Sequence, residues 1–377
     1  MHRTALAIRV SLALAISAFM LPAVAQQRFP SSAGDLVVET VASGLEHPWG
    51  LAFLPDRRML VTERPGRLRL VSASGEISRP ITGVPNVVAR GQGGLLDVVL
   101  DPNFAQNRTL YLSFAEPRAG GNGTSVAKAR LSANGTALEG LNVIFRQSPA
   151  INSNMHFGSR LVFDRTGALF VTVGDRYSQR DQAQNPANHI GKLLRISPDG
   201  GPAPGNPKKE GWAPEIWSIG HRNVQGAALH PETGQLWTAE HAARGGDEIN
   251  TPKAGRNYGW PVITYGIDYS GAKIGEGTSK PGMEQPLFYW DPSIAPSGAA
   301  FYTGDVWPAW KNSLFVGALA GQMLVRLSTK GEAVTGEERL LAGLGERIRD
   351  VRQGPDGFLY LLSDDEKGKV LRVKPAR

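Results

Sequence analysis

The sequence predicts an all-β fold, a six-bladed β-propeller whose blades are four-stranded antiparallel sheets. Three observations support this prediction. Few stretches keep apolar residues at positions i, i+3, i+4 and i+7 for more than about ten residues, so helices are nearly absent. Short apolar runs bounded by Gly, Pro, Asn and Asp recur along all 377 residues. A module of strand, turn and strand occurs six times, at the spacing of propeller blades that carry long insertions.

The N-terminal residues have the features of an export signal. Two arginines precede a mostly apolar run from Leu12 to Leu21, and Ala23-Val24-Ala25 supplies the small residues of a cleavage site before Gln26. The run is too short to span a membrane, and no later segment approaches ~18 uninterrupted apolar residues. We therefore expect residues 1–25 to be a cleaved signal peptide, and residues 26–377 to form one propeller domain that is periplasmic or secreted.

The six modules follow one another in order along the chain. They start at Leu51, Val98, Arg160, Gly226, Gly298 and Asp350, with turns near Asp56, Pro102, Asp164, Pro231, Asp305 and Asp356. The turns are about 45 to 75 residues apart, which leaves room in each blade for outer strands and long loops. A seven-bladed ring and a pair of β-sandwiches are the alternatives, but neither accounts so directly for six modules.

Ring closure involves the two ends of the mature chain. The strand LVVETV at Leu36 precedes the first full module, and KVLRVKP at Lys369 ends the chain. Because an open propeller would leave edge strands unpaired, we expect one of these strands to complete a blade begun by the other terminus.

The composition and the missing motifs exclude several kinds of site. The chain has no Cys, which removes disulfides, thiol nucleophiles, Cys-ligated zinc, iron–sulfur clusters and thioether-bound haem. Nicotinamide, nucleotide and serine-hydrolase sites are disfavoured, because the corresponding Gly-rich and G-x-S-x-G motifs are missing. The positive charges are scattered, which argues against a nucleic-acid partner. Because the chain has no Cys to attach a cofactor, any redox reaction must use a non-covalently bound cofactor.

The candidate base is His156, which lies in MHFGSRLVF just before the third module. Asp175 lies at the far end of the same hairpin, in VTVGD. A His held by a carboxylate has a defined tautomer and a basicity suited to taking a proton near neutral pH. Of the seven His, only His156 has such an acid across a hairpin. The alternative is a surface His that caps a strand.

Two further segments could contribute to a site. GHRNVQG places Arg222, Asn223 and Gln225 in one short connection, and the planar fork of Arg suits carboxylates and quinone oxygens. The Gly-rich stretch from Ala239 onward supplies carboxylates and flexible carbonyls of the kind that Ca²⁺ requires, although EF-hand spacing is missing. Loop residues that satisfy carbonyls and a solvated acidic loop are the respective alternatives.

Seven longer blocks are HPWGLAFLPD at His47, GQGGLLDVVLDPNFA at Gly91, HFGSRLVFD at His156, EIWSIGHRNVQG at Glu215, GGDEIN at Gly245, NYGWP at Asn257 and RIRDVRQGPDG at Arg347. In content and order they resemble the soluble quinoprotein aldose sugar dehydrogenases, the family of soluble glucose dehydrogenases that use pyrroloquinoline quinone (PQQ) and Ca²⁺. The likeness covers nearly the whole mature chain and is closest to the bacterial aldose sugar dehydrogenase branch.

The resemblance implies oxidation of an aldose at C1 to its lactone. It assigns His156 as the general base that takes the anomeric hydroxyl proton, and Asp175 as the residue that orients it. Hydride would pass from C1 to PQQ C5, whose carbonyl would be polarised by Ca²⁺ and Arg222. An external electron acceptor of unknown identity would then reoxidise the cofactor.

The resemblance also implies the ligand contacts. PQQ would contact Gln92, Arg222, Asn223, Gln225, Arg347 and Arg349. One Ca²⁺ would bind PQQ and the backbone carbonyls of Ala242 and Ala243, and a second, structural Ca²⁺ would use the carbonyls of Glu248 and Tyr258 with Asp268 nearby.

Three departures from the glucose dehydrogenases bear on cofactor affinity rather than on reaction type. Ala320 stands where they have a PQQ-contacting lysine, Met155 stands where an Asp precedes the catalytic His, and Ala242-Ala243 replaces a Gly-Pro pair. The alternative function is a Ca²⁺-dependent propeller lactonase or esterase, and a non-catalytic binding propeller is a third. A lactonase would need a cage of Asn, Asp and Glu side chains around the axis, whereas Arg222, Arg347 and Arg349 favour a quinoprotein.

Overall fold

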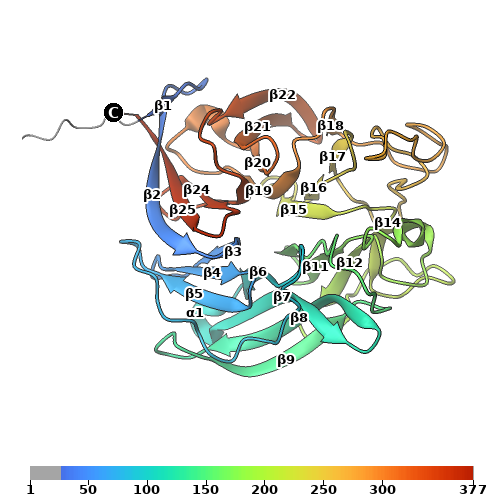
Figure 1. Cartoon of the computed structure of the whole chain (residues 1–377), viewed down its shortest axis with the longest axis horizontal. Helices are drawn as coiled ribbons and strands as arrows, with labels where there is room; N and C mark the ends of the chain where they lie inside the picture. The colour runs from blue at the N-terminus through green and yellow to red at the C-terminus, as the bar shows by residue number, and fades with distance from the viewer. Residues whose placement is uncertain (1–26, 377) are drawn as a thin grey trace, which may run out of the picture.

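The computed structural model describes residues 27–376, which form six antiparallel β-sheets arranged around a central axis (Figure 1). Helix in this part of the chain is limited to α1 (Phe104–Asn107) and the 3₁₀ turns η1 (Arg180–Gln184) and η2 (Pro308–Trp310). The predicted six-bladed β-propeller is confirmed. The predicted signal peptide, residues 1–25, lies outside the described residues. Among the described residues, no helix is long and apolar enough to cross a membrane.

The blades contain three to five strands each. Blade 1 comprises β3 (Pro48–Phe53), β4 (Met59–Glu63) and β5 (Arg67–Val71), and blade 2 comprises β6 (Leu95–Leu100), β7 (Thr109–Arg118), β8 (Gly121–Leu131) and β9 (Leu138–Arg146). Blade 3 comprises β10 (Leu161–Phe163), β11 (Leu169–Val173), β12 (Lys192–Ser197), β13 (Gly200–Pro202) and β14 (Ile216–Ile219). Blade 4 comprises β15 (Val224–Leu229), β16 (Leu236–Glu240), β17 (Asp247–Asn250) and β18 (Phe288–Trp290). Blade 5 comprises β19 (Pro296–Phe301), β20 (Leu314–Ala318), β21 (Met323–Lys330) and β22 (Ala333–Leu340), and blade 6 comprises β23 (Ile348–Gln353), β24 (Leu359–Ser363), β25 (Gly368–Pro375), β2 (Leu36–Leu45) and β1 (Arg28–Phe29).

The six sequence modules are the two inner strands of the six blades. The first strands, β3, β6, β10, β15, β19 and β23, contact one another in this order, and β23 contacts β3. The ring is closed by β2, which pairs with β25 from Leu36 opposite Pro375 to Leu45 opposite Gly368 (Figure 1). The expectation that one terminus completes a blade of the other is therefore confirmed, and β25 is not left with an open edge.

Packing between neighbouring blades explains why the second strands are so apolar. Every residue of β4, β11, β16, β20 and β24 is buried, because each strand is covered on both faces by adjacent blades. The recurring Thr of these strands is polar for a local reason. Thr62 Oγ1 accepts a hydrogen bond from the amide of Gly50 on β3, and Thr172 Oγ1 accepts one from the amide of Arg160, directly before β10, at 2.9 Å in both cases.

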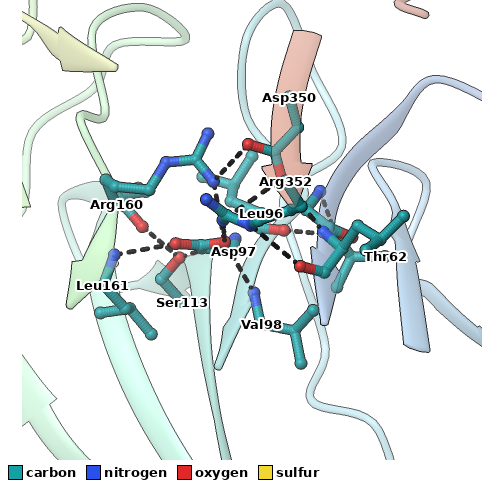
Figure 2. A network of polar contacts seen from close by, with 12 residues as sticks. Thr62, Leu96, Asp97, Val98, Ser113, Arg160, Leu161, Asp350 and Arg352 are labelled. Atoms are coloured by element: carbon teal, nitrogen blue, oxygen red, sulfur yellow. Dashed lines mark hydrogen bonds and ion pairs between the residues drawn. The ribbon is translucent and has the colours of Figure 1, made fainter. Parts of the chain in front are cut away.

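A buried ionic network fills the axis of the ring (Figure 2). Arg160 Nη1 lies 2.9 Å from Asp97 Oδ1 and 3.2 Å from Asp350 Oδ1. Arg352 Nη2 lies 3.4 Å from Asp97 Oδ1 and 3.2 Å from Asp350 Oδ2. The network packs against glycine on a neighbouring inner strand, since a Cβ at Gly298 would lie 2.1 Å from Asp350 Oδ1. The axis at this level is therefore occupied by paired charges, in place of the Asn, Asp and Glu cage that a lactonase would need.

Candidate functional site

Two adjoining cavities lie where the inner strands of the blades begin. The axial cavity, of about 270 Å³, is lined by the predicted residues Gln92, Asn223, Gln225, Arg347 and Arg349. The side cavity, of about 260 Å³, is lined by His156, Asp175, Arg222, Ala243 and Asp268. A larger depression of about 750 Å³ shares residues with both cavities and joins them. The structure thus gathers into one region ten of the residues that the sequence and the resemblance singled out.

The His156–Asp175 pair forms as expected from the hairpin. His156 Nδ1 lies 2.6 Å from Asp175 Oδ1, and both side chains are buried. Asp175 also accepts hydrogen bonds from Trp260 Nε1 at 2.8 Å and from the amide of Tyr177 at 2.8 Å. With Nδ1 engaged, Nε2 is the ring nitrogen left to meet a ligand in the side cavity. Burial lowers the pKa of His156 and its contact with Asp175 opposes this shift, so the ring is a neutral base near neutral pH.

The loop that carries His156 is held in an unusual conformation. His156 has φ of 50°, and Arg176 and Tyr177 have φ of 57° and 63°, values that non-Gly residues rarely adopt. Arg176 secures this loop, since its Nε donates to the carbonyl of Met155 at 3.0 Å and its guanidinium lies 3.9 Å over the ring of Phe157. Such strain persists where the surroundings fix it, commonly at functional sites.

Arg222 connects the base to the Gly-rich loop of blade 4. Its Nη1 donates to the carbonyls of His241, at 2.8 Å, and Ala242. Its backbone amide donates to the carboxylate of Glu240, which also contacts His221 Nδ1 at 3.0 Å. The carbonyl of Ala242 therefore already faces a cation in this structure.

A group of arginines forms one wall of the axial cavity around Asp364. Arg349 Nη2 lies 2.8 Å from Asp364 Oδ2, and Arg349 Nη1 donates to Gln225 Oε1 at 3.0 Å. Arg64 and Arg347 approach the same carboxylate at 3.6 and 3.9 Å. Against the effect of burial, the charges of Arg349 and Arg64 hold the pKa of Asp364 well below its usual range. The cavity thus has three cations around one carboxylate.

The structure does not place all the predicted metal ligands at one site. Ala243 lines the side cavity and Ala242 precedes it in the chain, and Asp268 lines the same cavity, where its Oδ2 is 3.6 Å from Arg180 Nη1. Glu248 pairs with Glu240 across β16 and β17, and burial together with the charge of Glu240 raises the pKa of Glu248 to about 8. Across residues 27–376, no cluster of three or more His, Asp or Glu side chains could hold a metal ion.

The prediction that only His156 has a carboxylate partner across a hairpin is wrong, and other His residues also pair with carboxylates. The other pairs are His47–Asp364 at 3.1 Å, His189–Glu215 at 3.3 Å, His221–Glu240 at 3.0 Å and His241–Asp247 at 3.3 Å. His221 and Glu240 flank the β15–β16 hairpin just as His156 and Asp175 flank β10–β11, but the sequence argument placed His221 only in the arginine cluster. It compared the other His residues only with their close sequence neighbours. His156 differs from the others in lining the side cavity together with its carboxylate.

Four contributors to the site were missed: Arg64, Arg176, Trp260 and Asp364. Trp260 lies in the NYGWP block, and Arg176 directly follows Asp175, so both had a signal in the sequence. Asp364 had one too, because it lies across the β23–β24 hairpin from Arg349, 15 residues away. Its contact with His47, 317 residues away in sequence, had none.

Comparison with known proteins places this geometry in a family. The family model described as Glucose / Sorbosone dehydrogenase matches residues 45–372. The aldose sugar dehydrogenase YliI of Escherichia coli K12 is 48% identical over 344 residues, which cover 90% of this chain and 92% of that protein.

Two solved structures extend the likeness to three dimensions. The soluble aldose sugar dehydrogenase of Escherichia coli in the apo-form has a TM-score of 0.88 at 48% identity, covering 90% of this chain and 100% of that chain. The PQQ-bound aldose sugar dehydrogenase of Streptomyces coelicolor has a TM-score of 0.75 at 30% identity, covering 90% of this chain and 98% of that chain. The chain therefore belongs to the glucose/sorbosone dehydrogenase family, whose members are oxidoreductases that act on sugars.

Proposed function

We propose that this protein is a PQQ- and Ca²⁺-dependent aldose sugar dehydrogenase that oxidises the anomeric carbon of an aldose to the lactone. One observation carries the proposal: a buried His–Asp pair and an arginine-lined cavity lie side by side. The names of the relatives, an aldose sugar dehydrogenase and a PQQ-bound homologue, support it.

The residues of the axial cavity fit a planar quinone with three carboxylates. Trp49, Leu96 and Phe157 form one apolar cluster and line the cavity, which suits the flat rings. On the wall, Nε of Arg64 and Nε of Arg349 are buried without hydrogen-bond partners. Because a buried cationic donor without a partner is costly, an anion in the cavity would be stabilised. Gln92, Asn223, Gln225, Arg347 and Arg349 would hold PQQ.

Ca²⁺ would be held by the carbonyls of Ala242 and Ala243, whose hard oxygen atoms suit this ion. The contact of Arg222 with the Ala242 carbonyl supports the choice, because that oxygen is placed to face a positive charge. Arg222 would give up this bond when the ion binds. We also propose a second, structural Ca²⁺ at the carbonyls of Glu248 and Tyr258. Asp268 lines the side cavity.

In the reaction, the protein supplies a base and positions the substrate. PQQ, when bound, supplies the two-electron acceptor for the hydride of C1. His156 Nε2 takes the proton of the anomeric hydroxyl, while Nδ1–H stays hydrogen-bonded to Asp175. The buried carboxylate stabilises the imidazolium that results, and Trp260 and the Tyr177 amide keep this carboxylate in place. Arg222, which lines the side cavity with His156, would supply a positive charge to the quinone carbonyl that accepts the hydride.

The test is spectroscopic. Purified protein is mixed with PQQ and Ca²⁺, the absorption spectrum of the bound quinone is recorded, and aldoses are added one at a time. We expect the sugar to reduce the bound quinone and lactone to form. A protein that binds no PQQ, or bound PQQ that no aldose reduces, would refute the proposal.

We also propose that the protein is exported and its signal peptide removed. N-terminal sequencing of the mature protein should then give a sequence that begins near Gln26.

A further inference from the structure

Arg64 lies in the turn between β4 and β5 and lines the axial cavity with Arg347 and Arg349. These three arginines come from two different blades, since Arg347 precedes β23 and Arg349 belongs to it. Neither the sequence motifs nor the resemblance assigns Arg64 a role. Its position nevertheless makes it part of the same cationic wall.

The guanidinium of Arg64 has unused hydrogen-bonding capacity. Of its five N–H donors, Nη1 donates to the carbonyl of Gly91 at 2.6 Å, and Nε is buried without a partner. Nη2 lies 3.6 Å from Asp364 Oδ1, which is an ion pair but beyond hydrogen-bonding distance. A side chain placed in this way can still bind an anion in the cavity.

The charges around Arg64 are not balanced. Burial lowers the pKa of Arg64, and the nearby charges of Arg349 and Arg347 lower it further, whereas Asp364 opposes them. Three cations therefore share one carboxylate. An anion with two or more negative charges would relieve the repulsion between the arginines, whereas a neutral ligand would not.

We propose that Arg64 is a cofactor-binding residue that donates to a carboxylate of PQQ. This inference rests on the proposed function. Arg64 supplies a third fixed cation from blade 1, while Ala320 on the adjoining depression supplies none. Its bond to Gly91 holds the segment next to Gln92, whose Oε1 accepts the amide of His156 at 2.7 Å. A contact with the cofactor must therefore be separated from a structural role in this segment.

The experiment measures cofactor binding as well as turnover. Apo forms of the wild type, Arg64→Gln and Arg64→Lys are titrated with PQQ in the presence of Ca²⁺ by protein fluorescence quenching, at several salt concentrations. The matched control is Arg58→Gln, which makes the same charge change at the other end of β4, where Arg58 pairs with Asp56 on the surface. Far-UV circular dichroism and thermal unfolding verify that each variant is folded.

We expect PQQ to bind Arg64→Gln about 10- to 100-fold more weakly than the wild type, the range for one lost charge-assisted hydrogen bond. Binding to Arg64→Gln should also depend less steeply on salt, because one ionic contact is missing. Arg64→Lys keeps the charge but not the fork, so its loss should be smaller. Arg58→Gln should bind like the wild type.

Wild-type affinity and salt dependence in Arg64→Gln would overturn the inference while leaving the proposed function intact. So would a variant that binds PQQ normally but turns over slowly, because Arg64 would then act through the Gly91 segment. If Arg64→Gln does not fold, Arg64→Lys carries the test: weaker PQQ binding with an unchanged salt slope supports a contact through the guanidinium fork, and wild-type affinity contradicts the inference. Failure of the wild type to bind PQQ would refute the proposed function itself.

Discussion

Replacing His156 by Gln should remove the base and leave the rest of the site in place. The residue His156 is 3% exposed, and its side chain makes one polar contact, with Asp175 at 2.6 Å. After substitution, Asp175 keeps its hydrogen bonds from Trp260 and Tyr177, so no buried carboxylate is left unsatisfied. We therefore expect the fold and the affinity for PQQ to be retained.

The expected loss in rate follows from the chemistry of the base. General-base catalysis contributes about 10² to 10⁴-fold. At about 1.36 kcal/mol per tenfold, this corresponds to a barrier increase of about 2.7 to 5.4 kcal/mol for His156→Gln. The assay is single-turnover bleaching of oxidised PQQ by a panel of aldoses, with holoenzyme reconstituted with Ca²⁺. Because the cofactor is already bound, the measured rate reports the chemical step rather than cofactor loading.

Asp175→Asn provides an independent test through the pH dependence. Burial lowers the pKa of His156 and the negative charge of Asp175 opposes this shift, so its removal lowers the pKa further. A neutral His156 would then persist to lower pH, and the acid limb of the rate profile should move to lower pH. The rate on the plateau should fall less than in His156→Gln, because the ring is still present but less basic and less well oriented.

The matched control for both variants is His189→Gln. His189 is also a buried His paired with a carboxylate, Glu215 at 3.3 Å, but it lines neither cavity. The His189→Gln variant should keep most of the wild-type rate of quinone reduction. A near wild-type rate of quinone reduction in His156→Gln, or an acid limb of Asp175→Asn that moves to higher pH, would refute the assignment of the base.

Two further predictions concern the arginines. Arg222→Ala should weaken PQQ binding and slow the reduction of bound PQQ. Arg349→Ala should mainly weaken PQQ binding, by about tenfold or more for a lost charge-assisted contact. Unchanged PQQ titrations of both variants would place the cofactor elsewhere. Arg160→Met should lower the free energy of unfolding by about 3 to 5 kcal/mol in urea denaturation, because it leaves Asp97 and Asp350 buried with one cation between them. A loss below about 1 kcal/mol, the level of a surface pair, would show that the axial network does not depend on this charge.

The fold could be predicted because each propeller blade is encoded locally. The inner strands are buried on both faces, so their apolar runs and the turns between them appear directly in the sequence. Ring closure by β2 and β25 could be predicted too, because a closed ring must pair its terminal strands. The number of strands per blade, from three to five, could not, because outer strands are half exposed and their pattern is weak.

The site could be predicted only where one hairpin or one motif contains the interacting residues. His156 and Asp175 flank a single hairpin, and their contact was expected. The Trp260–Asp175 hydrogen bond links residues 85 positions apart, and the Arg64–Asp364 ion pair joins blade 1 to blade 6. Such contacts depend on how the blades are placed around the axis, and a single sequence carries no local signal for them.

The network that fills the axis also supports the floor of the axial cavity. Arg160 lies 4.3 Å from the ring of Trp49, and Arg349, on the cavity wall, lies 6.0 Å from the same ring. Because Trp49 lines the cavity while Arg160 is fixed by Asp97 and Asp350, the paired charges on the axis hold the indole in position from its buried side. The inner strands therefore carry the paired charges of the axis and, in Trp49 and Leu96, part of the apolar surface proposed for the cofactor. The proposed base, His156, lies in the loop that precedes β10.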